Sequence, residues 1–256
     1  MRGEWLARFS PLIAVLPLLA ACSGGGVRDN DATGSLGTSE GESPGDLYVK
    51  LAVEYLKAGQ TETALRKVHK ALEEDGNNAQ AHSVVALVYQ RLGQDQLAEK
   101  HFRMAISLKP KDPYVLNAYA SFLCDRRKFS EADTQYQKAL ANPLYPTPWV
   151  AMTNRGICAK RRGNSSKAES HFRQALTANP SFGPAMAAMA ELDYGRGNYK
   201  SARGHLDRYF QVSQPTPQVL LLAVRVERKL GSRKRASTYA QMLHKSYPSS
   251  REALQL

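Results

Sequence analysis

The chain has 256 residues, of which 43% are hydrophobic and 23% charged, an ordinary composition for a soluble protein. Its formal net charge is +12, and no acidic tail offsets that charge. A basic chain of this kind can bind nucleic acid, anionic lipid headgroups or an acidic peptide. The N-terminal sequence indicates which of these partners is available to it.

Residues 1–21 have the pattern of a secretory signal peptide. Arg2 and Arg8 give a basic start, and an apolar run from Phe9 to Ala20 follows. Two prolines interrupt this run, which is too short to be a comfortable membrane span. We therefore predict that the protein is exported, which argues against nucleic acid as its partner.

The signal ends in Leu19-Ala20-Ala21-Cys22, which resembles the bacterial lipobox. Cleavage before Cys22 would leave that cysteine to carry several acyl chains, and these together make a stable membrane anchor. The alternative is a plain signal peptide with an incidental cysteine. Ser23 stands where an aspartate commonly retains such lipoproteins in the inner membrane, so we predict a lipid anchor on the periplasmic face of the outer membrane.

Residues 22–44 contain the lipidated cysteine and then a stretch rich in glycine, serine and acidic residues, without apolar periodicity. This composition predicts a flexible tether. A random coil of about 22 residues reaches roughly 25 Å, so the tether would hold the following domain just off the membrane surface.

Residues 45–250 repeat with a period of 34, most clearly over 79–112. Small residues stand at repeat positions 8, 20 and 27, aromatic residues at 11 and 24, and a proline at 32. Small residues let two helices cross closely, aromatic residues fill the space around them, and proline ends the second helix. The residues at these positions are Ala86, Tyr89, Ala98, Phe102, Ala105 and Pro110.

The same frame fits six consecutive segments, the last two degenerate. They begin at Gly45, Ala79, Pro113, Trp149, Gly183 and Pro217. A two-residue slip falls in the proline-rich connection 142–148, where an insertion costs little because no helix continues through it. The pattern closely resembles the tetratricopeptide motif and predicts an all-α solenoid of six helix-turn-helix repeats. Residues 251–256 would form a C-terminal tail that caps the array or frays.

Two cysteines remain once Cys22 is assigned to lipidation. Cys124 and Cys158 lie late in the first helices of the third and fourth repeats, and first helices of adjacent repeats pack side by side. In an oxidising periplasm we predict a disulfide between them. It would close a loop of about 35 residues and stabilise the fold by roughly 3–4 kcal/mol. Two buried free thiols are the alternative.

The sequence contains no catalytic constellation, no zinc-ligand spacing and no phosphate-binding glycine loop. His101, His171 and His205 all occupy repeat position 23. Equivalent atoms in neighbouring repeats lie about 10 Å apart, so these histidines cannot share one ion. We predict a protein that is not an enzyme and that uses no cofactor, no metal and no small-molecule substrate.

The concave face of the solenoid is the predicted binding surface. First-helix positions 2, 5, 9 and 12–13 line it, with apolar residues in the first two repeats and polar residues further on. An apolar stripe that nothing in the chain covers indicates a partner peptide or helix. The predicted groove residues are Val49, Val53, Leu56, Leu87, Asn117, Ser121 and Asn154. Alternatively, the frame is rotated and some of them belong to the core.

Basic clusters recur where the first helices end. They are 126–128, 160–162, 228–229 and 233–235. One interpretation is favourable placement near helix dipoles on a solvated edge. The other is a positive rim that faces anionic headgroups or an acidic partner. Arg155 also stands at repeat position 7, which is usually apolar, and the sequence gives no reason for it.

Lipobox, polar tether and six repeats together resemble the type IV pilus biogenesis lipoproteins of the PilF/PilW family, the pilotins of the pilus secretin. The most specific likeness is in residues 117–124 and 154–158, which resemble the asparagine- and cysteine-bearing first helices of that family's third and fourth repeats. The resemblance implies an outer-membrane lipoprotein that binds the secretin subunit and promotes its localisation and multimerisation, supporting pilus biogenesis and twitching motility. The alternative function is an envelope adapter that bridges peptidoglycan-synthesis or division proteins.

Overall fold

The computed structural model describes residues 43–256. The predicted signal peptide, Cys22 and nearly all of the tether lie outside the described residues. Within that range the chain forms twelve α-helices and one short 3-10 helix and no strand. The first helix begins at a capping box, in which Ser43 and Asp46 bond each other's backbone N–H groups.

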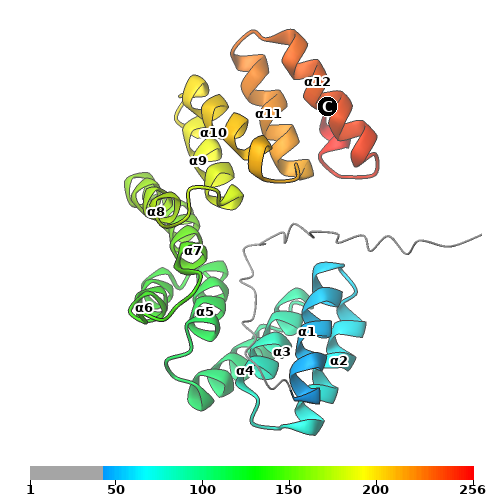
Figure 1. The fold of residues 1–256 in the computed structure, drawn as a ribbon, viewed down its shortest axis with the longest axis vertical. Coiled ribbons are helices and arrows are strands. Elements are labelled where there is room, and N and C mark those ends of the chain that lie inside the picture. The colour runs from blue at the N-terminus through cyan, green and yellow to red at the C-terminus, as the bar shows by residue number, and fades with distance from the viewer. Residues whose placement is uncertain (1–42) are drawn as a thin grey trace, which may run out of the picture.

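The helices form six antiparallel hairpins, which confirms the predicted all-α solenoid of six repeats. They are α1 (Pro44–Lys57), α2 (Thr61–Glu74), α3 (Ala79–Arg91), α4 (Asp95–Leu108), α5 (Pro113–Asp125), α6 (Phe129–Leu140), α7 (Pro148–Arg161), α8 (Ser165–Ala178), α9 (Gly183–Gly195), α10 (Tyr199–Val212), α11 (Pro217–Lys229) and α12 (Arg233–Ser246). The first helices of successive repeats pack side by side, and the array follows an open curve from α1 to α12 (Figure 1).

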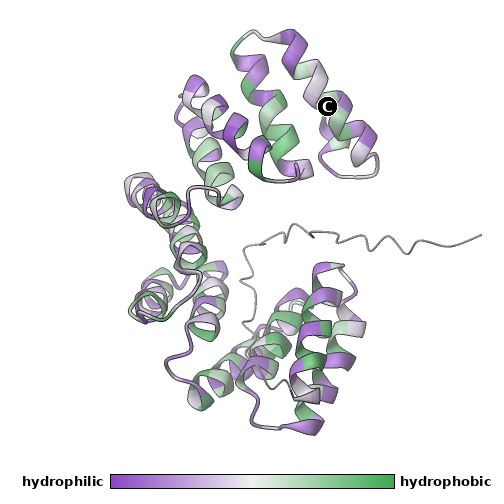
Figure 2. Cartoon of the chain, viewed as in Figure 1, coloured by the Kyte–Doolittle hydropathy of each residue, from purple (hydrophilic) through white to green (hydrophobic). Residues whose placement is uncertain are grey.

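The core of each hairpin is built on the small residues that the repeat predicts. All positions 8 and 20 of the first four repeats are buried, and the ring at position 24 is buried beside them in repeats two to four. Figure 2 shows hydrophobic and hydrophilic segments alternating along α1 and α2, as expected for helices with one buried face. The fourth repeat has Gly156 at position 8, where the ring of Phe172 lies directly against the helix.

The turn inside each hairpin needs one residue in the left-handed conformation. Five of the six repeats have glycine there, with φ between 71° and 88°. The third repeat has Arg127 at the equivalent place, with φ 60°, and this is the one positive φ of a non-glycine residue in the described part of the chain. Such a conformation costs a residue with a Cβ about 1–2 kcal/mol.

The slip in the repeat pattern is a longer connection between two hairpins. Residues 141–147 join α6 to α7, whereas four residues make each of the other connections between repeats. The Tyr145 side chain is buried in this connection and packs edge-on against the Tyr114 ring, with the ring centroids 5.2 Å apart. The longer connection is therefore anchored to the start of α5 by an aromatic contact.

The two degenerate repeats replace part of the apolar core with a buried polar network. Glu227 of α11 is 2% exposed and accepts a hydrogen bond from Arg203 of α10 at 2.9 Å. It also forms an ion pair with Arg235 of α12, with 3.0 Å between the nearest nitrogen and oxygen atoms. A buried carboxylate is tolerated when charged donors pair with it in this way. The network connects the fifth repeat to the sixth.

The C-terminal residues cap the solenoid. Ala253, in the 3-10 helix Ala253–Gln255, is buried against leucines of α11 and α12. The Tyr247 hydroxyl donates to the Pro215 carbonyl at 2.7 Å, and the Gln218 amide donates to Glu252 at 2.9 Å. Of the two sequence-based alternatives for the tail, the capping arrangement is therefore the one that the structure contains.

We predict that Gly156→Ala lowers the free energy of unfolding. A Cβ at this position would lie 2.5 Å from Phe172 Cε1, and Phe172 is fully buried. Overpacking costs about 1–3 kcal/mol, against a gain of about 1 kcal/mol in helix propensity. A net loss of about 1 kcal/mol is expected in urea denaturation.

Gly204→Ala is the matched control, because Gly204 is also helical but has no atom within 4 Å of a Cβ built there. This variant should be more stable than the wild type by about 0.5–1 kcal/mol. An equal gain at both positions would contradict the close crossing of α7 and α8.

Candidate partner-binding groove

A small apolar pocket opens on the concave side of the first three repeats. It has a volume of about 30 Å³ and lies between α1, α3 and α5. Val53 and Leu56 come from α1, Leu87 from α3 and Asn117 from α5, so four of the seven predicted groove residues line the pocket. A cavity of this size accepts the end of one apolar side chain rather than a whole ligand.

Several lining residues were not identified from the sequence. These are Lys57, Ser83, Val84, Arg91, Tyr114 and Ala118. Lys57 and Arg91 lie at the C-terminal ends of α1 and α3, so they place positive charge at the edge of an apolar recess. The Arg91 guanidinium also donates to the Leu56 carbonyl, which connects the first two repeats at the pocket.

The prediction for Val49 is wrong. Its side chain is 1% exposed and packs with Val68 of α2 and Val84 of α3, inside the core of the first two repeats. The physical reason is the rotation of α1, which turns repeat position 5 toward the second helix and the next repeat. Position 9, represented by Val53 and Leu87, is half-buried and faces the pocket.

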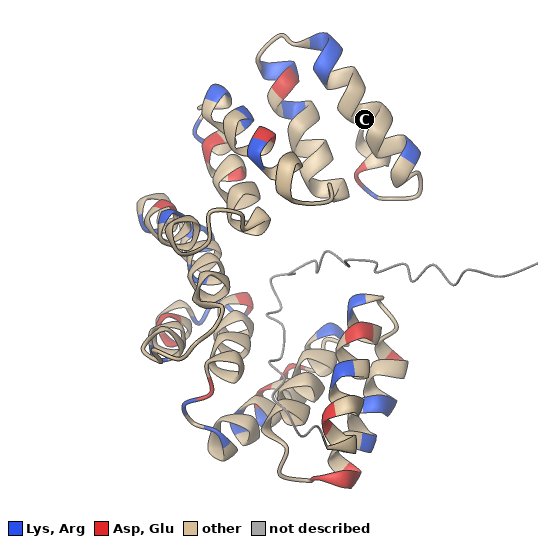
Figure 3. Cartoon of the chain, in the orientation of Figure 1, with Lys and Arg blue, Asp and Glu red and all other residues tan. Residues whose placement is uncertain are grey.

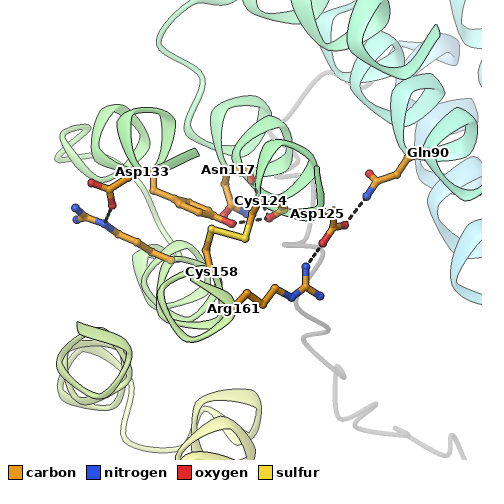
Figure 4. The surroundings of a disulfide bond; sticks show 10 residues. Gln90, Asn117, Cys124, Asp125, Asp133, Cys158 and Arg161 are labelled. Atoms are coloured by element: carbon orange, nitrogen blue, oxygen red, sulfur yellow. Dashed lines mark hydrogen bonds and ion pairs between the residues drawn. A yellow bond between two sulfur atoms is a disulfide. The ribbon is translucent and has the colours of Figure 1, made fainter. Parts of the chain in front are cut away.

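Ser121 and Asn154 do not line the pocket. The assignment of Asn154 to the groove is wrong because its side chain is buried, whereas Ser121 is half-buried and its place in the groove stays a prediction. Asn154 of α7 is buried and donates to the Asn117 side-chain oxygen at 3.2 Å. The Ser121 hydroxyl lies 3.0 Å from the hydroxyl of Tyr136 and donates to the Asn117 carbonyl. These polar groups therefore join helices within and between the third and fourth repeats, and the Asn117 side chain lies at that junction (Figure 4).

The pair Cys124 and Cys158 forms a disulfide between α5 and α7, with the two Cα atoms 5.7 Å apart. Next to it, Asp125 accepts a hydrogen bond from Gln90 of α3 at 2.7 Å and pairs with Arg161 of α7 (Figure 4). The covalent bond thus fastens the third repeat to the fourth, across the longer connection, and polar contacts extend the link to the second repeat.

Arg155 has a structural role that its sequence position did not reveal. Its guanidinium donates to Asp133 of α6 at 2.6 Å, and the side chain is only 19% exposed. Burial raises the pKa of Asp133, but the hydrogen bond and the charge of Arg155 outweigh burial and hold this pKa below its usual range. The pair joins the second helix of one repeat to the first helix of the next.

Two of the six histidines contact each other. His82 and His101 are in contact, with their Nδ1 atoms 3.1 Å apart, and burial followed by the neighbouring His82 lowers the pKa of His101 to about 4. Over residues 43–256, no three metal-ligating side chains are grouped closely enough to hold an ion. None of the helices in that range is long and apolar enough to cross a membrane.

A second, much larger hollow of about 1190 Å³ lies on the concave side of repeats four to six. Ile157, Ala187 and Leu222 contribute apolar surface to it, and Arg225 and Arg251 contribute charge. The sequence did not predict this hollow because its wall includes the C-terminal cap, whose packing has no repeat signature.

Comparison with known proteins supports the architecture. The tetratricopeptide repeat family matches residues 55–122 and 123–181. The type IV pilus assembly protein PilF of Pseudomonas aeruginosa is 30% identical over 207 residues, which cover 81% of this chain and 82% of that protein. An uncharacterised Haemophilus influenzae protein is 34% identical over 111 residues, covering 43% of this chain and 62% of that protein.

Two solved structures are similar over most of the chain. The crystal structure of PilW, a widely conserved type IV pilus biogenesis factor, has a TM-score of 0.68 and 31% identity, and the match covers 84% of this chain and 98% of PilW. The structure of Pseudomonas aeruginosa PilF has a TM-score of 0.65 and 30% identity, with 82% of this chain and 95% of PilF covered.

The fold and the pocketed concave face define a tetratricopeptide-repeat protein, a class of protein-binding scaffold. Within that class the chain belongs to the PilF/PilW family of type IV pilus biogenesis proteins.

We predict that replacing both Cys124 and Cys158 with alanine lowers the free energy of unfolding by about 2–4 kcal/mol, because the closed loop restricts the unfolded chain. Thermal or urea denaturation measures the change. Reductant should destabilise the wild type and leave the double variant unaffected. Alkylation of both cysteines in the non-reduced protein, isolated without reductant, would contradict the bond.

Proposed function

We propose that the protein is an outer-membrane lipoprotein that binds the type IV pilus secretin and promotes its outer-membrane localisation and multimerisation. The observation that carries this proposal is the apolar pocket on the concave face of repeats one to three, in a chain of the PilF/PilW family. In this function the protein supports pilus biogenesis and twitching motility as a binding scaffold, without catalysing a reaction.

The pocket suits an anchor residue of a secretin segment. Val53 and Leu87 are half-buried, so a visiting aliphatic or aromatic side chain removes their exposed surface from water. Lys57 and Arg91 at the edge would pair with an acidic residue that flanks this anchor. The pocket is present in the unbound chain, so little ordering opposes binding.

The lipid anchor predicted at Cys22 supplies the second part of the mechanism. Acyl chains hold the solenoid at the membrane where the secretin ring assembles. Confinement to that surface raises the local concentration of bound subunits, which favours their association without any further contact.

The test is complementation of a gene deletion with a variant that carries Val53→Asp and Leu87→Asp. Charge in the apolar pocket should weaken secretin capture by at least about tenfold, since burying an unpaired carboxylate costs more than 1.4 kcal/mol. Detergent-resistant secretin multimers, detected in outer-membrane fractions, should be lost in the deletion, restored by the wild type and absent with this variant.

Leu97→Asp with Met104→Asp is the matched control, because both residues are exposed on α4, outside the pocket. These substitutions should leave the multimers intact, and thermal denaturation verifies that both double variants are folded. A wild-type amount of secretin multimers with the pocket variant would show that the secretin binds at another site. Normal multimers and pili in the deletion strain would favour an envelope adapter instead.

The anchor is tested by expressing the chain with Cys22→Ala behind an ordinary cleavable secretion signal. The protein should then fractionate with soluble periplasmic protein and lose incorporation of labelled fatty acid, whereas the wild type stays with the outer membrane. Unchanged membrane fractionation of this variant would argue against anchoring through Cys22.

A further inference from the structure

The positive charge of the solenoid is concentrated in its second half. Residues 43–147 contain fourteen lysines and arginines and twelve acidic residues, a net charge of +2. Residues 148–256 contain eighteen basic and six acidic residues, a net charge of +12. The two halves have the same fold, so folding alone does not require this difference.

The acidic side chains of the second half are already engaged. Glu169, Glu191, Asp207 and Glu227 are in ion pairs with basic residues of this half, Asp193 accepts from Ser201 and lies near His205, and Glu252 accepts from Gln218. No carboxylate is left over to neutralise the remaining lysines and arginines. The excess charge therefore faces solvent or a partner.

Four of these cations stand together where α11 turns into α12. Arg228, Lys229, Arg233 and Lys234 are exposed, and their side chains form no hydrogen bond or ion pair with any residue in the described part of the chain. Figure 3 shows blue segments on both sides of this turn, at the free end of the last hairpin. We call these four residues the cationic tip.

We propose that the cationic tip docks on the anionic phospholipid headgroups of a bilayer. Each lysine or arginine held near an anionic membrane surface adds to the attraction between protein and membrane. The tip projects from the end of the array and does not line either concave pocket. A projecting, purely cationic surface suits an extended layer of headgroups, whereas a protein partner would usually find buried apolar anchors.

The inference adds a second attachment point to the lipid anchor in the proposed function. The anchor precedes the first repeat, and the cationic tip is in the last. Contact at both ends would fix how the solenoid lies on the membrane and thereby the direction in which the concave face opens. Two weak attachments on one chain also bind more strongly than either alone.

The test uses the mature chain with Cys22→Ser, which carries no acyl chain, and vesicles of phosphatidylethanolamine with phosphatidylglycerol. The protein should co-sediment with these vesicles, dissociate at high salt, and bind vesicles of pure phosphatidylcholine much more weakly. Reversal of the tip by R228E, K229E, R233E and K234E should weaken binding to the anionic vesicles by at least about tenfold.

The matched control reverses four exposed lysines of the first half, by K100E, K109E, K111E and K138E. This changes the net charge equally and should leave vesicle binding within about twofold of the unreversed chain if the tip is the site. If both variants lost vesicle binding equally, net charge alone would explain the binding and the proposal would be overturned. Binding no stronger to anionic than to phosphatidylcholine vesicles would also overturn it, in favour of an acidic protein partner.

We do not expect the tip variant to lose vesicle binding through unfolding. Arg233 and Lys234 lie in the first turn of α12, where glutamate interacts favourably with the helix dipole, and Arg228 and Lys229 lie in the last turn of α11, where glutamate interacts unfavourably. The two effects oppose each other, so the reversed tip should unfold at about the same temperature as the unreversed chain, and thermal denaturation verifies this. The assay contains neither secretin nor an acyl chain. A negative outcome therefore leaves the proposed function untouched, and failure of secretin assembly would leave this inference untouched.

Discussion

The close crossing of two helices over a small residue is the constraint on which this structure depends. Each hairpin brings repeat positions 8 and 20 together, and at Gly156 the approach is so close that the Phe172 ring occupies the space of a Cβ. Because every hairpin closes in the same way, the first helices fall into one row. That row makes a concave face, and the pockets exist only because neighbouring hairpins are aligned.

The sequence was sufficient for the architecture, because a period of 34 residues fixes the number of hairpins and the identity of their buried small residues. It was not sufficient for the groove, because the repeat frame gives a position along a helix but not the exact rotation of that helix. Val49 and Val53 are one helical turn apart, yet one is in the core and the other faces the pocket. A small rotation decides between these places.

The sequence also did not predict which side chains contact each other between neighbouring repeats. Arg155 is an anomaly in its own repeat and is explained only by Asp133, on the preceding helix. Asn117 and Asn154 suggested peptide recognition as single side chains, but as a bonded pair they hold two repeats together. A polar residue in such an array can bind another protein or bond to a neighbouring repeat. Only the structure, which shows what the side chain contacts, distinguishes these two roles.

The disulfide between α5 and α7 also changes how the array can come apart. Repeats that contact only their neighbours unfold from the ends inward, one unit after another. A covalent bond between the third and fourth repeats keeps the two middle hairpins together, so these hairpins should unfold more cooperatively than the terminal ones. Terminal repeats could then open and reclose while the centre keeps its register, so the centre serves as a template for refolding.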